Sequence, residues 1–153
     1  MITITNHVDE LPPRDELWEV VQEAYSYLHE WVTNPTTRVH PHYGKVHFDI
    51  SKWGYKGLES CMVCVAGLYY LRKYDLLLGV EYSYGYEPYP KVAEFLDDLT
   101  YSSVDDDTLI EKYLGVAIPR GLRAGLVGVG PWDNTYPEHL LAFLQWLLGQ
   151  RTV

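Results

Sequence analysis

The residue types best able to do chemistry gather between positions 40 and 49. His40 and His42 are separated by one residue, and so are His47 and Asp49. Alternate residues of an extended segment project to one side, so each pair would present two ligands together. Imidazole and carboxylate groups suit Zn²⁺ or Mn²⁺. One hypothesis is a metal site built from these four residues; the other is that they are solvated or hydrogen-bond to their neighbours.

The two cysteines, Cys61 and Cys64, lie three residues apart at the start of an expected helix. There they could complete a tetrahedral metal site, or act as a redox pair because a thiol near a helix N-terminus has a lowered pKa. The strand of a βαβ unit that would support a redox motif is missing from the pattern. We therefore interpret both as small apolar core residues, and their number favours a reducing cytoplasm over a disulfide framework.

A run of carboxylates stands out in the second half of the chain. Its members are Asp97, Asp98, Asp105, Asp106, Asp107 and Glu111. Acidic residues before a helix are ordinary capping choices. The alternative is a surface that imitates phosphate charge and binds a partner protein with a basic groove, aided by electrostatic steering. The aspartates of this run are therefore candidate partner-binding residues.

Tyrosines follow one another closely between positions 79 and 90. Tyr82, Tyr84 and Tyr86 alternate with other residues, and Tyr89 follows between two prolines. A spacing of two suits an extended segment with its rings on one side. If exposed, the first three would be rigid anchors of an interface; if buried, they belong to the core.

Length and charge limit the choice of function. The chain has 153 residues and a net charge of −9, which favours one domain over residues 1–153 with an extended segment over 1–13. The negative charge argues against direct nucleic-acid binding. Apolar runs fall short of the roughly 20 residues of a membrane span, and the N-terminus lacks a signal-peptide pattern, so a cytoplasmic location is expected.

Hydrophobic periodicity predicts the elements. Apolar residues from Leu17 to Val32 recur with helical spacing and predict a helix over 14–33, ended by Asn34-Pro35. Residues 36–44 are predicted as loop and 45–50 as a short strand or extended segment. Ser60 is a plausible N-cap for a buried central helix over 61–74.

Three shorter helices are predicted at 91–99, 107–114 and 137–148, the last with Pro137 in its first turn. Glycines break up 122–132, which is predicted as a short helix followed by a turn at best. The expected fold class is mainly α: a compact single-domain helical bundle of about five helices that leaves room for a small β-hairpin.

Two stretches, His47–Gly54 and Glu59–Gly67, resemble an uncharacterised family of small phage and bacterial proteins. The family pattern runs Phe-Asp-Met, a Trp, and then Cys-Gly-Thr-x-x-Cys-Ile-Ala-Gly. The matching residues are Phe48, Asp49, Trp53, Cys64, Ala66 and Gly67. The first Cys of the pattern falls on Glu59, its Gly on Ser60 and its Thr on Cys61. The resemblance implies an accessory protein of a phage or mobile element and implies no reaction.

The expected function is that of an acidic accessory protein that binds and modulates a host protein, as an inhibitor or anti-defence factor. It would need no cofactor and would bind neither nucleic acid nor a membrane. The expectation leaves open whether the chain self-associates. The first alternative is a small metal-dependent enzyme that uses His40, His42, His47 and Asp49. The second is a protein that binds a small nucleotide in an aromatic pocket.

Overall fold

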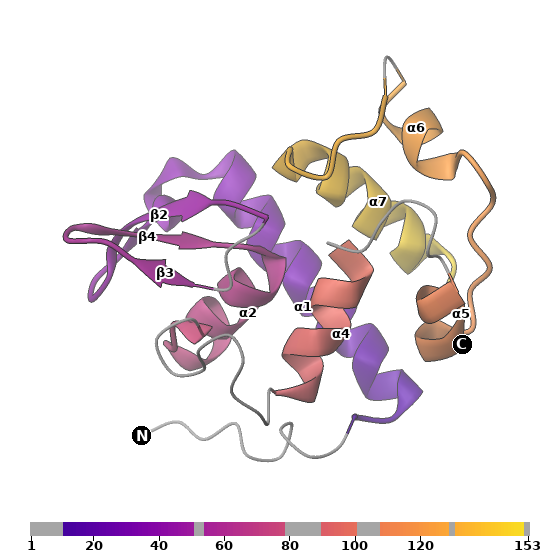
Figure 1. Cartoon of the computed structure of the whole chain (residues 1–153), viewed down its shortest axis with the longest axis horizontal. Helices are drawn as coiled ribbons and strands as arrows, with labels where there is room; N and C mark the ends of the chain where they lie inside the picture. The colour runs from indigo at the N-terminus through magenta and orange to yellow at the C-terminus, as the bar shows by residue number, and fades with distance from the viewer. Residues whose placement is uncertain (1–10, 51–53, 79–89, 101–107, 129–130, 152–153) are drawn as a thin grey trace.

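A 20-residue helix, α1 (Arg14–Thr33), runs along most of the molecule (Figure 1). The computed structural model describes residues 11–50, 54–78, 90–100, 108–128 and 131–151. Leu17, Val21 and Leu28 lie on the buried face of α1, and Asp15 in the first turn faces the positive end of the helix dipole. The helix predicted over 14–33 is confirmed.

The C-terminus of α1 is capped by an arginine that follows it. Arg38 donates from Nε to the carbonyl oxygen of Trp31 at 2.6 Å and from Nη2 to that of Val32 at 2.8 Å. Its guanidinium also lies 4.4 Å from the centre of the Trp31 ring. Arg38 ends the 3-10 helix η2 (Pro35–Arg38), so η2 turns the chain from α1 into the first strand.

Four short strands form one mixed sheet in the order β1-β2-β4-β3. Their bounds are β1 (Val39–His40), β2 (Gly44–Phe48), β3 (Tyr55–Lys56) and β4 (Ser60–Val63). The pairs β1–β2 and β3–β4 are antiparallel, whereas β2 and β4 pair in parallel. Strand β1 falls within the segment predicted as loop, and β2 confirms the predicted short strand.

The predicted helix over 61–74 is wrong at its start. Residues 60–63 form β4, and the helix α2 (Val65–Tyr74) begins only after Cys64, whose φ of −87° and ψ of −171° are extended. Ser60 is therefore a strand residue and not the N-cap. A short buried apolar run fits a strand as well as a helix, so the pattern alone could not separate β4 from α2.

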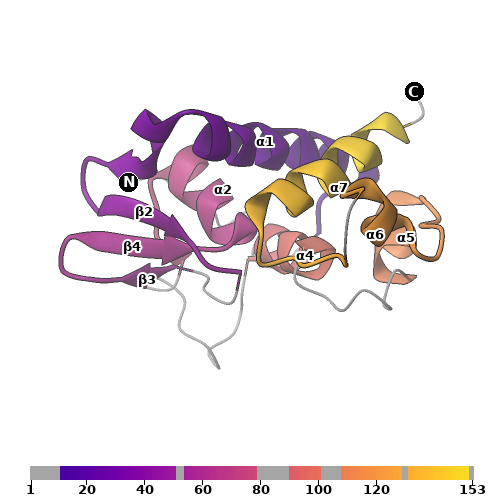
Figure 2. The ribbon, with the colours of Figure 1, turned by 90° about the horizontal axis from the view of Figure 1, so that it is seen from above.

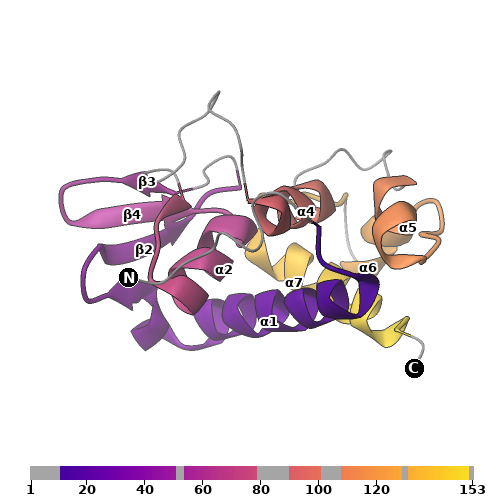
Figure 3. The ribbon, with the colours of Figure 1, turned by 90° about the horizontal axis from the view of Figure 1, so that it is seen from below.

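Helix α2 packs against α1, against β4 and against α4 (Lys91–Thr100). Figures 2 and 3 show the sheet at one end of the molecule and the later helices at the other. These helices are α5 (Thr108–Leu114), α6 (Leu122–Leu126) and α7 (Pro137–Gly149). The predicted helices over 91–99, 107–114 and 137–148 and the short one near 122 are confirmed.

The described residues thus form a mainly helical fold with a small sheet. Helix α7 packs along α1, and α5 packs against both α1 and α4. In the part of the chain that the structure describes, no helix combines the length and the apolar character needed to cross a membrane.

Candidate functional site

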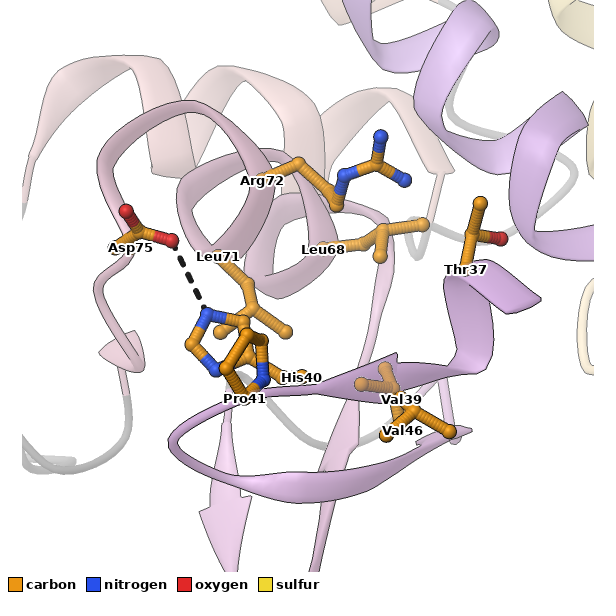
Figure 4. A pocket seen from close by; sticks show the side chains of 9 residues that line it. All are labelled: Thr37, Val39, His40, Pro41, Val46, Leu68, Leu71, Arg72 and Asp75. Carbon is orange, nitrogen blue, oxygen red and sulfur yellow. Dashed lines mark hydrogen bonds and ion pairs between the residues drawn. The ribbon is translucent and has the colours of Figure 1, made fainter.

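A pocket of about 240 Å³ lies between the β1–β2 hairpin and α2 (Figure 4). Strand residues form one side, helix residues form the other, and Thr37 of η2 lies at one end. The residues that line it are Thr37, Val39, His40, Pro41, Val46, Leu68, Leu71, Arg72 and Asp75. A concave site with apolar walls and a few polar groups is the usual form of a small-ligand pocket.

His40 closes the end of the pocket that faces the end of α2. Its Nε2 lies 3.1 Å from Oδ1 of Asp75, and its Nδ1 accepts hydrogen bonds from the backbone N–H groups of His42 and Tyr43. A ring nitrogen that accepts carries no proton, so this network assigns the proton of the neutral ring to Nε2, which donates to Asp75. Both nitrogens of His40 are therefore engaged within the protein.

Asp75 is held in an uncommon backbone conformation. It is the C-cap of α2, with φ 53° and ψ 37° in the left-handed region, and its N–H donates to the carbonyl oxygen of Leu71. Aspartate tolerates this region better than most residues. The helix end and the β1–β2 hairpin are thereby joined through the side chains of Asp75 and His40.

Arg72 borders the pocket one turn before Asp75. Its Nη2 donates to Oε2 of Glu30 on α1, and its guanidinium lies 5.3 Å from the centre of the Tyr27 ring. Its Nη1 is buried and has no hydrogen-bond partner among the residues that the structure describes. A buried donor without an acceptor costs free energy, so the ion pair between Arg72 and Glu30 has to offset the cost of leaving Nη1 unpaired.

The predicted metal set is not assembled. His40 pairs with Gly44 in the β1–β2 register, whereas His47 lies three residues further along β2. Because side chains alternate along a strand, His47 lies on the exposed face of the sheet, opposite to buried Val46. No group of three or more metal-ligating side chains that could hold an ion occurs among the described residues, which include His42 and Asp49.

Both cysteines lie in the core, as we predicted, but not on one helix. Cys61 is in β4, and Cys64 is the N-cap of α2, where its Sγ accepts from the N–H of Gly67 at 3.4 Å. Burial raises the pKa of the Cys61 thiol and raises that of Cys64 to about 12. The thiolate form that redox or metal chemistry requires is therefore disfavoured at both positions.

The structure describes the acidic run at its two ends, Asp97 and Asp98 on α4 and the exposed Glu111 on α5. Asp98 on α4 accepts a hydrogen bond from the Tyr113 hydroxyl of α5 at 3.0 Å. Burial, followed by this bond to Asp98, raises the pKa of Tyr113 to about 12. Asp97 is half-buried on the same helix. The other predicted partner-binding residues lie outside the described residues; they are Asp105, Asp106, Asp107, Tyr82, Tyr84 and Tyr86.

The main polar groups of the pocket were not among the residues predicted to be functional. The sequence pattern singles out neither Arg72 nor Asp75. Their association with Thr37 and His40 depends on the packing of the hairpin beside α2, which local patterns do not encode. The local signal for the left-handed C-cap is the position of Asp75 directly after the basic last turn of α2, since aspartate tolerates a positive φ.

Comparison of the chain with protein-family models, with curated protein sequences and with solved structures finds no match in any of the three. The fold and the pocket define a mainly helical protein with a small mixed sheet and a cavity at the junction of the two.

Proposed function

We propose that the protein acts by binding another protein, and that the acidic segment between α4 and α5 makes the contact. The net charge of −9 is unevenly spread along the chain. The segments outside the described residues contain a single basic residue, Lys52, and these acidic ones: Asp9, Glu10, Glu81, Glu87, Asp105, Asp106 and Asp107. The three consecutive aspartates are the densest charge among them.

Both helices that border the segment are held in place by hydrogen bonds and ring packing, and this observation carries the proposal. Tyr113 bonds to Asp98, and its ring meets that of Phe95 edge to face at a centroid distance of 5.2 Å. At the end of α4 the carbonyl oxygen of Thr100 accepts from Nδ2 of Asn134 at 3.2 Å. Binding residues in proteins are usually held in place by a rigid scaffold on either side of them, and α4 and α5 provide such a scaffold.

The C-terminus of α5 is fixed as well. Arg14 at the start of α1 donates from Nε to the carbonyl oxygen of Tyr113 at 3.3 Å and from Nη2 to that of Lys112 at 3.5 Å. A cation at a helix C-terminus also opposes the negative end of the dipole. Helix α5 is thereby tied to α1 at its C-terminus and to α4 through the hydrogen bond from Tyr113 to Asp98.

Charge determines the class of partner. A cluster of carboxylates attracts a surface rich in Lys and Arg, accelerates the encounter and disfavours acidic partners. The tyrosine segment that includes Tyr82, Tyr84 and Tyr86 precedes α4, whereas the acidic segment follows it. Helix α4 has ten residues and is therefore about 15 Å long. A basic protein surface of ordinary interface size could contact both segments at once.

The finer part of the proposal concerns the origin of the partner. We propose that it is a protein of a host cell and that the present chain modulates it as an accessory factor of a phage or mobile element. This part rests on the resemblance of residues 47–67 to the family pattern described above. The charge-based part stands without it.

The experiment compares the proteins of a host-cell lysate that three immobilised versions of the chain retain. They are the native chain, a variant with Asp105→Asn, Asp106→Asn and Asp107→Asn, and a control with Asp15→Asn, Glu59→Gln and Glu138→Gln. The control removes the same charge from exposed positions elsewhere. We expect a basic protein that the native chain and the control retain and that the first variant loses. Equal retention by all three would contradict the proposal.

A further inference from the structure

A second cavity lies where the first turns of α1 and α4 meet the end of α5. We propose that it binds a small organic anion with a carboxylate or phosphate head and an apolar body. Its volume of about 460 Å³ falls within the range of roughly 300–1,000 Å³ that is usual for ligand pockets. Residues 101–107 join the opposite ends of α4 and α5, so the proposed protein contact is a different site.

Part of the cavity lining is apolar. Leu17 of α1 and Pro12, just before that helix, are buried. The exposed Leu11 and the half-buried Tyr113 add further apolar surface. Figure 3 shows the start of α1, in indigo, beside α4, and the two helices are in contact. The body of the ligand is therefore apolar, since covering these side chains removes apolar surface from water.

The charged residues of the lining are mostly basic. Arg14, Lys91 and Lys112 line the cavity together with one carboxylate among the described residues, that of Glu94. The chain as a whole has 12 basic and 21 acidic residues, so this excess of cations is opposite to the overall balance. Cations gathered around a cavity attract an anion, and the attraction is stronger beside apolar walls than in open water.

Two of these three cations lack a carboxylate partner. Nζ of Lys91 lies 3.4 Å from Oε2 of Glu94, so these two charges offset each other. Within the described residues, the guanidinium of Arg14 donates only to the carbonyl oxygens of Lys112 and Tyr113. The ammonium group of Lys112 forms no ion pair with any described residue. The lining therefore keeps a positive charge that an anionic head would neutralise.

Two unmatched cations favour a doubly charged head. A phosphate monoester carries a charge of about −1.5 to −2 at pH 7, whereas a carboxylate carries a single charge. Both heads accept charge-assisted hydrogen bonds from guanidinium and ammonium groups. We therefore expect both to bind, and the phosphate to bind more tightly.

The test uses probes with the same benzyl body: benzyl phosphate, phenylacetate, benzyl alcohol and benzylamine. Methyl NMR signals of Leu11 and Leu17 in the native protein report on the cavity. We expect benzyl phosphate to shift these signals in a saturable way, with a millimolar dissociation constant because few atoms bind. Added salt should weaken its binding.

The other probes rank the heads. Phenylacetate should bind more weakly than benzyl phosphate by a factor of several up to about ten, the alcohol more weakly still, and the amine not at all. Tighter binding of phenylacetate than of benzyl phosphate would support an anion site with a carboxylate as its natural head. The proposal is overturned if neither anion shifts the signals, or if the alcohol or the amine binds as tightly as the better anion.

Three variants locate the binding. Lys112→Gln removes a cation from the lining, and Lys45→Gln removes one from β2; both native side chains are exposed, so both variants should fold. Lys112→Gln should weaken benzyl phosphate binding by about three- to tenfold, and Lys45→Gln should leave it unchanged. Glu94→Gln removes the carboxylate of the lining and should tighten binding, a gain that damage to the fold would not produce. Equal affinities of the two lysine variants, or weaker binding by Glu94→Gln, would overturn the proposal.

Discussion

The hydroxyl of Tyr113 on α5 donates a 3.0 Å hydrogen bond to the Asp98 carboxylate on α4. These residues lie on the two helices that border the segment 101–107, so the bond joins the supports of the proposed contact. It also means that Asp98, which the sequence predicted as a partner-binding residue, contributes to holding α4 and α5 together.

Replacing this hydroxyl should weaken both the fold and partner binding. Tyr113→Phe keeps the ring that packs against Phe95 but removes the donor to Asp98. We expect the free energy of unfolding to fall by about 1 kcal/mol, the usual net value of one hydrogen bond. Urea denaturation measures this loss. An unchanged unfolding midpoint would show that the bond does not join the helices in solution.

The same pair predicts a dependence on pH. The pKa of Tyr113 is raised from 10.0 to about 12 in the fold, so the folded state holds this proton more tightly than the unfolded state. The resulting stabilisation is complete below pH 10 and is lost as the pH rises toward 12. The variant Tyr113→Phe lacks this pH-dependent stabilisation. The stability difference between the native chain and this variant should therefore narrow over that interval, and a constant difference would contradict the assignment.

Gly44 should tolerate no side chain. It adopts φ +77° in β2, and a Cβ there would overlap the backbone carbonyl of Glu59. Strain and overlap together should make Gly44→Ala less stable by about 2–4 kcal/mol. Gly125→Ala on α6 is the control, since nothing lies within 4 Å of its added Cβ. It should unfold at an equal or higher temperature, and similar losses in both variants would refute the explanation.

Two histidines of the predicted metal set should differ in their effect on stability. His40→Ala removes the hydrogen bonds to Asp75, His42 and Tyr43 and should cost about 1–2 kcal/mol, because Asp75 is largely exposed. His47 is exposed on β2, so His47→Ala should stay within about 0.5 kcal/mol of the native chain. Thermal unfolding distinguishes them. Equal effects would mean that the His40 network is not formed.

Most helices could be predicted from the sequence because their signals are local. Helix α1 has a continuous apolar stripe from Leu17 to Leu28, two acidic residues at its start and Asn34-Pro35 at its end. Pro137 and Gly149 mark the ends of α7 in the same way. Such patterns contain both the periodicity and the boundaries of a helix.

The sheet and the pocket could not be predicted in this way. Whether Cys61 and Val63 belong to a strand or a helix depends on their pairing with β2. In that pairing Cys61 lies opposite Val46, which is fifteen residues earlier in the chain. The same parallel pairing places buried Val46 near α2, and the β1–β2 turn then brings His40 to Asp75. These contacts are non-local. The alternation of side chains along a strand, which suggested a metal site, places His40 and His47 on opposite faces of the sheet.

The most direct test of the proposed function is the affinity of the purified partner, once captured, for the native chain and for the variant with Asp105→Asn, Asp106→Asn and Asp107→Asn. Isothermal titration calorimetry at low and high salt gives both affinities. We expect the variant to bind at least about tenfold more weakly at low salt, with a smaller salt dependence than the native chain. Equal affinity and equal salt dependence would show that the acidic segment does not make the contact.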